Sequence, residues 1–257
     1  EQVQAYARSL TVALSTSGTS RWYFLEHGNP RQGYHQPHEF ESYGRLVIDR
    51  VMEIAAIIFA DGVQTLFIPG FAGGQGSRNP EYHRNMQWVY RMLVDDVTRR
   101  LYDRYQMGVV FRGAWRRLFE WLNADDLARD FEVLEQEAQG RERRLIWYVA
   151  DDFIPVEVLP LVRDSLNVTG AMPAMTALSE AYYGRPLEKV DIFIGNNKPS
   201  VAGLCPPLLS LGDLYYTVSP ITYLQADDWR RILYDHLFER RGHYRDFQSM
   251  DETTIEE

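Results

Sequence analysis

The chain has 257 residues, of which 45% are hydrophobic and 25% are charged. These proportions are typical of a globular protein with a buried core, and they exclude a disordered, collagen-like or coiled-coil chain. The formal net charge of −9 argues against binding to the phosphate backbone of nucleic acid. This length is common for one α/β domain, so we expect a single domain over residues 1–245. Residues 246–257 are polar and acidic and are expected to form a disordered tail.

The cysteine content and the length of the apolar runs indicate where in the cell the protein is expected to be. Cys205 is the single cysteine, so the chain cannot form an internal disulfide, and a reducing, cytoplasmic location is expected. The apolar run Ile54–Ala60 is far shorter than the roughly 20 residues of a membrane span. The N-terminus shows no basic start followed by an apolar stretch. No transmembrane segment is therefore predicted, and any membrane contact would be peripheral.

Short β-type runs alternate with longer amphipathic runs, a pattern typical of a parallel sheet covered by helices. The predicted fold class is therefore α/β, with a central, mainly parallel sheet surrounded by helices. Six strands are predicted, at Thr11–Ser15, Val63–Ile68, Val109–Arg112, Leu145–Val149, Val190–Ile194 and Leu214–Val218.

Apolar residues that recur at steps of three and four predict the helices. One such series covers Phe40–Ile58, and another covers Tyr82–Tyr105 as one long helix. Asn123 and Asp125 are candidate N-caps for a later helix. Further helices are predicted at Trp115–Leu122, Leu127–Ala138, Pro155–Leu166, Ala174–Tyr183 and Asp228–Arg241.

Loops beyond the carboxyl ends of the strands are the candidate sites, because ligands bind there in open parallel sheets. The first, Ser15-Thr-Ser-Gly-Thr-Ser-Arg-Trp22, is rich in hydroxyls and carries an arginine, so its backbone amides could hold an anion. A flexible turn without a ligand is the alternative. No G-x-x-x-x-G-K-[ST] or G-x-G-x-x-G motif follows a strand, so ATP and dinucleotides are disfavoured.

Three other loops carry candidate groups. The glycine-rich stretch Pro69–Pro80 is either a lid over a ligand or a surface loop. Asp151-Asp152 follows the fourth strand and either binds a divalent metal or caps the next helix. Gly195–Ser200 ends the fifth strand with a lysine and a serine at alternate positions.

Several stretches together are specific enough to indicate a family. They are Ser17-Gly-Thr-Ser-Arg-Trp22, Tyr182-Tyr-Gly184, Asp191-Ile-Phe-Ile-Gly195 and Leu214-Tyr-Tyr-Thr-Val218 leading to His236. Over about Thr11–Arg241 the chain resembles the cis-prenyltransferase (undecaprenyl diphosphate synthase) superfamily. Within it, the chain is most similar to diterpene synthases of the tuberculosinol synthase and tuberculosinyl-adenosine transferase type. The resemblance implies a homodimer with a hydrophobic tunnel between the sheet and two long helices.

The resemblance also implies roles for individual residues. The family's diphosphate-cradling loop falls on Ser17–Trp22. Asp213 falls on the acidic residue that chain-elongating members use for magnesium. The expected diphosphate ligands are Gly18, Thr19, Arg21, Arg78, Lys198 and Ser200. The expected catalytic residues are Tyr43, Arg21 and Asp152, and the expected walls of the hydrophobic pocket are Trp22, Tyr82 and Trp88.

Three departures from the family pattern shape the expected activity. Ser17 stands in place of the catalytic aspartate, which is half of the usual magnesium pair. Gly195 stands in place of an arginine that binds isopentenyl diphosphate, and Lys198 replaces another arginine. Repeated chain elongation is therefore not expected. Magnesium is expected to stimulate the reaction without being required, with Asp151-Asp152 as the alternative metal site.

The expected function is that of a terpene synthase or cyclase. It would ionise a linear or already cyclised allylic prenyl diphosphate and release diphosphate, giving a terpene olefin or alcohol. Tyr43 would accept the final proton or position water. One alternative is transfer of the prenyl group to a non-isoprenoid acceptor. The other is a catalytically silent subunit that partners an active cis-prenyltransferase, which the loss of the loop aspartate would suit.

Overall fold

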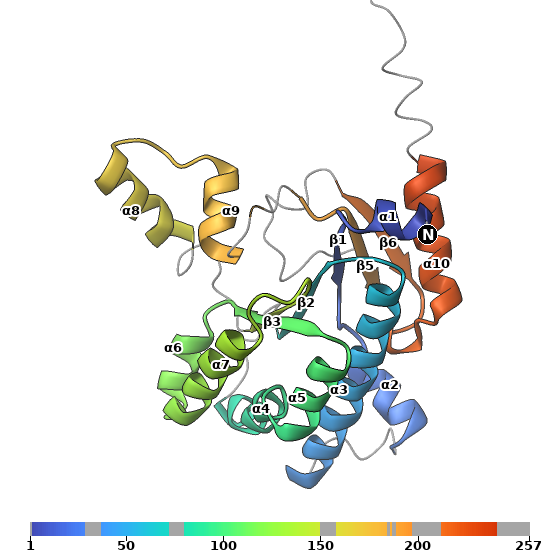
Figure 1. Cartoon of the computed structure of the whole chain (residues 1–257). Helices are drawn as coiled ribbons and strands as arrows, with labels where there is room; N and C mark the ends of the chain where they lie inside the picture. Colours follow the sequence, from blue (N-terminus) through green and yellow to red (C-terminus); the bar gives the residue numbers. More distant parts are fainter. Residues whose placement is uncertain are drawn as a thin grey trace, which may run out of the picture.

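The structure, a computed structural model, describes residues 2–28, 37–71, 80–149, 158–183, 186, 189–196 and 212–240. Six parallel strands form one sheet in the order β3-β4-β2-β1-β5-β6 (Figure 1). The predicted α/β class and all six predicted strands are confirmed, with strand ends shifted by no more than three residues. The strands are β1 (Thr11–Leu14), β2 (Thr65–Phe71), β3 (Met107–Arg112), β4 (Arg143–Val149), β5 (Ile192–Asn196) and β6 (Asp213–Thr217).

Helices surround this sheet. The first two described helices were not among the predicted ones. The described helices are α1 (Gln2–Ala7), α2 (Thr19–Glu26), α3 (Pro37–Ala60), α4 (Pro80–Met92), α5 (Asp96–Arg104), α6 (Trp115–Trp121), α7 (Asp125–Glu137), α8 (Leu159–Thr169), α9 (Met175–Tyr183) and α10 (Ala226–Tyr234). A 3-10 turn, η4 (Ile221–Tyr223), precedes α10, and a π-helix, η5 (Asp235–Glu239), follows it.

Strand β1 comes first in the chain but lies inside the sheet, between β2 and β5. The chain leaves β1 toward β2 on one side and leaves β5 toward β6 on the other. In open α/β sheets, such a divergence opens a crevice at the carboxyl ends of the two strands, and ligands bind there. The candidate loop Ser15–Trp22 directly follows β1 at this place.

Alternate residues of the central strands enter two apolar clusters, because successive side chains of a strand point to opposite faces. Val12 and Leu14 belong to the large core that the helices share. Ala13 and Phe193 belong to a smaller cluster, against which Leu161 of α8 packs. Burial on both faces explains why these strands read as continuous apolar runs in the sequence.

The prediction of one continuous helix over Tyr82–Tyr105 is wrong, because two helices, α4 and α5, occupy that stretch. Asp95 caps α5 by accepting a hydrogen bond from the Thr98 amide at 2.8 Å, and it also pairs with Arg45 of α3. The apolar spacing continues through the break, so periodicity alone could not reveal it.

Two other helix predictions also change. Ala124, which has no side-chain acceptor, occupies the N-cap of α7, while Asn123 adopts a left-handed φ of 54° and Asp125 is already helical. The predicted C-terminal helix Asp228–Arg241 is α10 continued by the π-helix η5. The start of the predicted Pro155 helix and the predicted tail over residues 246–257 lie outside the described residues.

The longest helix, α3, is fixed at its middle to the segment that follows β6. The Arg50 side chain donates hydrogen bonds to the carbonyls of Thr222 and Leu224, at 2.7 and 2.8 Å. These two bonds hold α3 beside the carboxyl end of the sheet, where α2 and η4 also meet. In contrast, α8 and α9 project from the body (Figure 1). No helix in the described part of the chain combines the length and apolarity needed to cross a membrane.

Candidate active site

The site is built on the loop between β1 and α2, which neighbouring strands hold on both sides. The Ser15 amide donates to the Ile194 carbonyl of β5 at 2.8 Å, and the Thr16 hydroxyl donates to the Pro69 carbonyl of β2 at 3.4 Å. Within the loop, the Ser15 and Ser17 hydroxyls lie 2.9 Å apart. The loop is therefore fixed over the crevice that the topology opens.

Gly18 turns the loop into α2 and leaves the first amides of the helix open. Its φ of 80° is in the left-handed region, which glycine adopts without strain. Gly18 is also the N-cap, so no side chain caps the helix, and the next amide with a helical partner is that of Trp22. The amides of Thr19, Ser20 and Arg21 therefore have no acceptor within the helix. Open amides at a helix N-terminus bind anions.

Arg21 adds a full positive charge to this turn. A Cβ placed on Gly18 would lie only 3.0 Å from the Arg21 Nη2 atom, so the guanidinium folds back over the loop. It would also lie 3.2 Å from Pro220 of the β6–η4 segment, which packs against the turn. Gly18, Thr19 and Arg21, three of the predicted diphosphate ligands, are thus brought together.

Tyr43, a predicted catalytic residue, reaches the same loop from α3. Its hydroxyl lies 2.6 Å from the Thr19 hydroxyl and 3.5 Å from that of Ser20. These contacts place a phenolic O–H next to the open amides of α2. The Thr19 hydroxyl can therefore carry a proton between Tyr43 and a molecule bound at the loop.

Aromatic rings continue from Tyr43 as one wall. Its ring packs edge-on against Tyr23 of α2, with centroids 5.4 Å apart, and against Phe40 at 5.9 Å. Phe40 in turn contacts Tyr82 of α4 at 6.3 Å, so the structure joins this predicted pocket residue to the site. Trp22 is buried and packs against His27. Trp88 remains 49% exposed, so it does not form an enclosed pocket wall in the described structure.

Asn196, the last residue of β5, is a site residue that the sequence analysis did not single out. Its side-chain amide donates to the Ser17 carbonyl at 2.5 Å, and the residue is only 4% exposed. The signal that could have found it is a polar residue at the carboxyl end of a buried strand, beside the crevice. Four predicted site residues, Arg78, Asp152, Lys198 and Ser200, lie outside the described residues.

Asp213, the predicted magnesium ligand, is not brought to this loop within the chain. It begins β6 and is level with Val12 of β1, because both pair with Ile192. The loop starts at Ser15, roughly 10 Å further along the strands and roughly 10 Å away across two strand spacings. Asp213 therefore lies toward the amino end of the sheet.

The carboxylate of Asp213 already has two cationic or donor partners. His236 Nδ1 lies 2.6 Å from one oxygen and Arg240 Nη1 lies 3.4 Å from the other. Arg240 also pairs with Asp235 at 2.7 Å, and Tyr215 donates to that same carboxylate at 2.7 Å. Burial raises the pKa of Tyr215, and the hydrogen bond from Tyr215 keeps the pKa of Asp235 below its usual value. This is a connected polar cluster on the edge strand.

These contacts do not fit a magnesium ion at Asp213, because its oxygens face positive charge or N–H groups. In the part of the chain that the structure describes, no three His, Cys, Asp or Glu side chains group as metal ligands. The alternative pair, Asp151-Asp152, lies outside that part. Asp213 thus has the surroundings of a structural residue that orients His236.

Asp213→Asn is therefore expected to act on stability. Loss of the charged acceptor beside buried His236 should lower the free energy of unfolding by about 2 kcal/mol, the value of a hydrogen bond to a charged group. Magnesium dependence of turnover should not change. Thermal melts and magnesium titrations measure the two effects, with Asp130→Asn on the exposed face of α7 as the control. A variant as stable as the wild type but unresponsive to magnesium would restore Asp213 as a metal ligand.

No family model matches the chain. Two curated relatives align with most of it. One is tuberculosinyl adenosine transferase of Mycobacterium tuberculosis, 28% identical over 233 residues, which are 89% of this chain and 74% of the relative. Another is (+)-kolavelool synthase of Herpetosiphon aurantiacus, 26% identical over 209 residues, which are 78% of this chain and 68% of the relative.

Solved structures match the fold over most of the chain. One is lavandulyl diphosphate synthase of Lavandula x intermedia in complex with dimethylallyl diphosphate. Its TM-score is 0.70 at 14% identity, covering 88% of this chain and 94% of that one. A probable undecaprenyl diphosphate synthase of Campylobacter jejuni has a TM-score of 0.60 at 11% identity, with the same shares covered. The parallel sheet flanked by helices is thus the cis-prenyltransferase fold.

Proposed function

Because this chain belongs to the cis-prenyltransferase superfamily, as an enzyme that acts on prenyl diphosphates, we propose that it is a terpene synthase. It ionises an allylic prenyl diphosphate, linear or already cyclised, and releases diphosphate and a terpene olefin or alcohol. The observation that carries the proposal is the loop after β1, where open helix amides, Arg21 and the Tyr43 hydroxyl meet. The relatives named a synthase and a transferase support the same chemistry.

Ionisation requires that the leaving diphosphate be stabilised as negative charge develops on it. Fixed donors that point at such charge lower the barrier, because they need no reorganisation during the reaction. The amides of Thr19 and Ser20 and the guanidinium of Arg21 supply these donors at the crevice. Since a planar guanidinium can hold two phosphate oxygens at once, Arg21 also orients the group.

The carbocation left behind needs an environment that stabilises it without trapping it. Ring faces do so through cation–π attraction, worth roughly 0.5–2 kcal/mol for each ring. The aromatic wall of Tyr43, Phe40 and Tyr82 lies next to the diphosphate loop and suits this task. Tyr43 then relays the final proton to the released diphosphate or directs water, with Thr19 as its hydrogen-bond partner.

The lack of space around Gly195 favours the proposal of ionisation over that of chain elongation. A Cβ at this position would lie 2.7 Å from a ring carbon of Tyr216 and 2.8 Å from one of Phe193. Such distances are closer than any real side chain tolerates, so an arginine for isopentenyl diphosphate has no room here unless these rings move. A second diphosphate partner is therefore not expected to bind at this point of β5.

The decisive experiment is incubation of the purified chain with a panel of linear and cyclic prenyl diphosphates, with and without isopentenyl diphosphate, followed by product chromatography. We expect diphosphate release and a terpene product from at least one substrate. Products lengthened by isopentenyl units would overturn the proposal. So would a result in which none of the substrates in the panel is consumed. A product that retains an added non-isoprenoid acceptor would instead assign the chain as a transferase.

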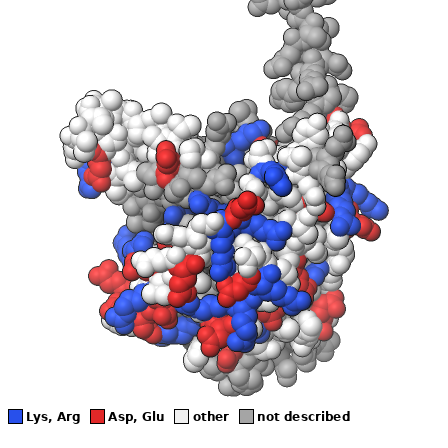
Figure 2. Space-filling view, in the orientation of Figure 1, with Lys and Arg blue, Asp and Glu red and all other residues white. Residues whose placement is uncertain are grey.

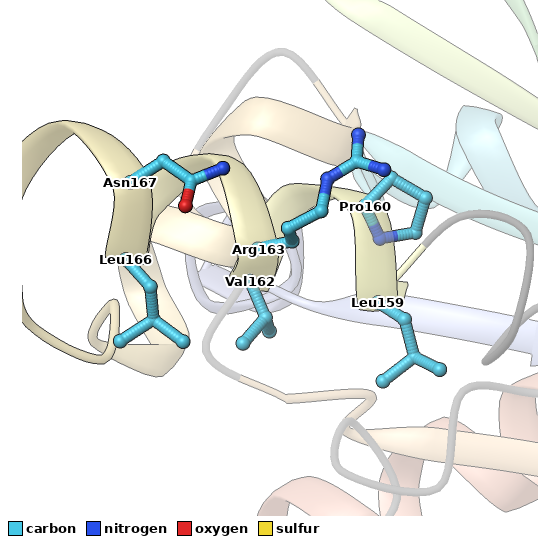
Figure 3. A pocket seen from close by; sticks show the side chains of 6 residues that line it. All are labelled: Leu159, Pro160, Val162, Arg163, Leu166 and Asn167. Carbon is cyan, nitrogen blue, oxygen red and sulfur yellow. The ribbon is translucent and has the colours of Figure 1, made fainter.

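We further propose that the chain forms a homodimer through the α8–α9 hairpin. Helix α8 has no buried residue, and Leu159, Val162 and Leu166 point to one side of it (Figure 3). On the visible face, the hairpin carries few charges, while red and blue groups cover the body below it (Figure 2). An apolar stripe of this kind on a projecting element is suited to a second copy of itself.

Leu166→Glu is expected to shift the protein to monomers. A charge buried in the apolar contact should weaken dimerisation by about 100-fold or more. Sedimentation or light scattering over a concentration series measures this. Val133→Glu on α7 is a matched control, because Val133 is 45% exposed but lies on a different element. A wild-type protein that stays monomeric at every concentration contradicts the homodimer.

A further inference from the structure

The side-chain amide of Asn196 is tied to the diphosphate loop by one of its two polar atoms only. A backbone carbonyl can only accept a hydrogen bond, so the atom that faces the Ser17 carbonyl at 2.5 Å is the amide nitrogen. The amide oxygen is left as the other polar atom on the same carbon. That oxygen is buried and has no hydrogen-bond partner among the residues that the structure describes.

Stability does not explain this arrangement. A buried acceptor without a donor costs free energy, because it has lost its hydrogen bonds to water. An apolar residue of the same size would avoid that cost. The amide oxygen lies beside the loop that is proposed to bind diphosphate, at the crevice between β1 and β5. Its missing donor is therefore expected to come from a bound molecule.

The hydrogen-bonding chemistry of the Asn196 amide oxygen indicates what kind of molecule binds there. An amide oxygen can only accept, and an ionised diphosphate offers only acceptor oxygens, so the two repel each other. The partner must therefore carry a hydrogen-bond donor, and water is the donor whose capture of a carbocation gives a terpene alcohol. Water bound through one of its O–H groups keeps a lone pair on its oxygen free to attack a carbocation.

We propose that Asn196 holds the water molecule that captures the carbocation, and that the chain therefore makes a terpene alcohol. This inference rests on the proposed function and deepens it. The allylic C–O bond breaks, and both electrons leave with the diphosphate. The water oxygen then forms the new C–O bond, and one water proton passes to the released diphosphate by way of the Tyr43 hydroxyl, which gives up its own proton as it takes the new one. Asn196 holds this water through its amide oxygen and fixes the loop through its amide nitrogen.

Substitutions can distinguish the role of the Asn196 amide oxygen from that of its amide nitrogen. Asn196→Ala removes both the donor and the acceptor. Asn196→Asp keeps an acceptor oxygen but loses the donor to Ser17. Thr65→Val is the matched control, because Thr65 also carries a buried, unpartnered hydroxyl but lies at the amino end of β2.

The readout is the ratio of alcohol to olefin formed in isotopically labelled water, measured together with KM. The wild type should form alcohol that carries the label. Asn196→Ala should lower the alcohol-to-olefin ratio roughly 3- to 10-fold, as expected for loss of one hydrogen bond. Asn196→Asp should keep the wild-type ratio but raise KM, since a carboxylate repels both the Ser17 carbonyl and the diphosphate. Thr65→Val should change neither quantity.

Two results would overturn this role. One is a wild type that consumes a prenyl diphosphate but forms only olefin. The other is an unchanged product ratio in Asn196→Ala, with at most a loss of melting temperature. In both cases the substrate is still consumed, so the proposed terpene synthase activity survives. If the wild type consumes no prenyl diphosphate at all, the proposed function itself fails.

Discussion

Arg21→Ala is expected to lower kcat/KM for the prenyl diphosphate by about 10²- to 10³-fold, the usual loss when one preorganised donor is removed from developing negative charge. The guanidinium lies over Gly18 and beside the open amides of α2, so it would contact the leaving group directly. Its side chain is exposed, so the free energy of unfolding should change by no more than about 0.5 kcal/mol. Steady-state kinetics and thermal melts together measure both quantities.

Arg21→Lys and Arg117→Ala make this test specific. Lysine keeps the charge but loses the planar fork, so it should retain only part of the activity. Arg117 is an exposed arginine on α6, far along the chain from the loop, and its loss should leave turnover unchanged. If activity and melting temperature fell together in Arg21→Ala, the side chain would be structural and not a diphosphate ligand.

Tyr43→Phe is expected to reduce kcat by at least about 10²-fold, which is the lower end of the contribution of a positioned acid or base. The substitution keeps the ring and therefore the contacts with Tyr23 and Phe40. It removes only the hydroxyl that lies 2.6 Å from Thr19. KM should change much less than kcat, because diphosphate binding does not depend on the phenol. Single-turnover measurements separate binding from chemistry.

Thr19→Val and Tyr6→Phe control this result. Valine has the shape of threonine but lacks the hydroxyl, so it should give part of the kcat loss by releasing Tyr43 from its partner. Tyr6 is 56% exposed on α1, and removal of its hydroxyl should have no effect on turnover. A kcat near the wild-type value in Tyr43→Phe would exclude the phenol from proton transfer.

The six strands were predictable because both faces of the sheet are buried, so each strand is a short apolar run bounded by polar residues. The division of α4 from α5 was not predictable from periodicity. It depends on Asp95, which caps one helix while pairing with Arg45 of another. That second contact joins positions about 50 residues apart, and no local pattern in the sequence records it.

The loop after β1 could be singled out as a candidate anion site because its residue types already have the needed chemistry. The positions of Tyr43 and Asn196 around it were harder to predict, since Tyr43 comes from the packed helix α3 and Asn196 from the neighbouring strand β5. Asp213 as a magnesium ligand stays a prediction. An acidic residue in a matching motif suggested magnesium, but its partners, His236 and Arg240, are set by the packing of η5 against β6.

The place of β1 inside the sheet also affects how the protein is made. The Thr11 amide bonds the carboxylate of Asp191, and these residues are 180 positions apart. At a synthesis rate of roughly 5–20 residues per second, β1 waits on the order of 10–40 s on the ribosome for β5. During that time one edge of β1 has no neighbour, and exposed strand edges are prone to aggregation. The loop after β1 gains its contact with β5 only after Asn196 emerges, so the nascent chain carries an incomplete candidate site until late in synthesis.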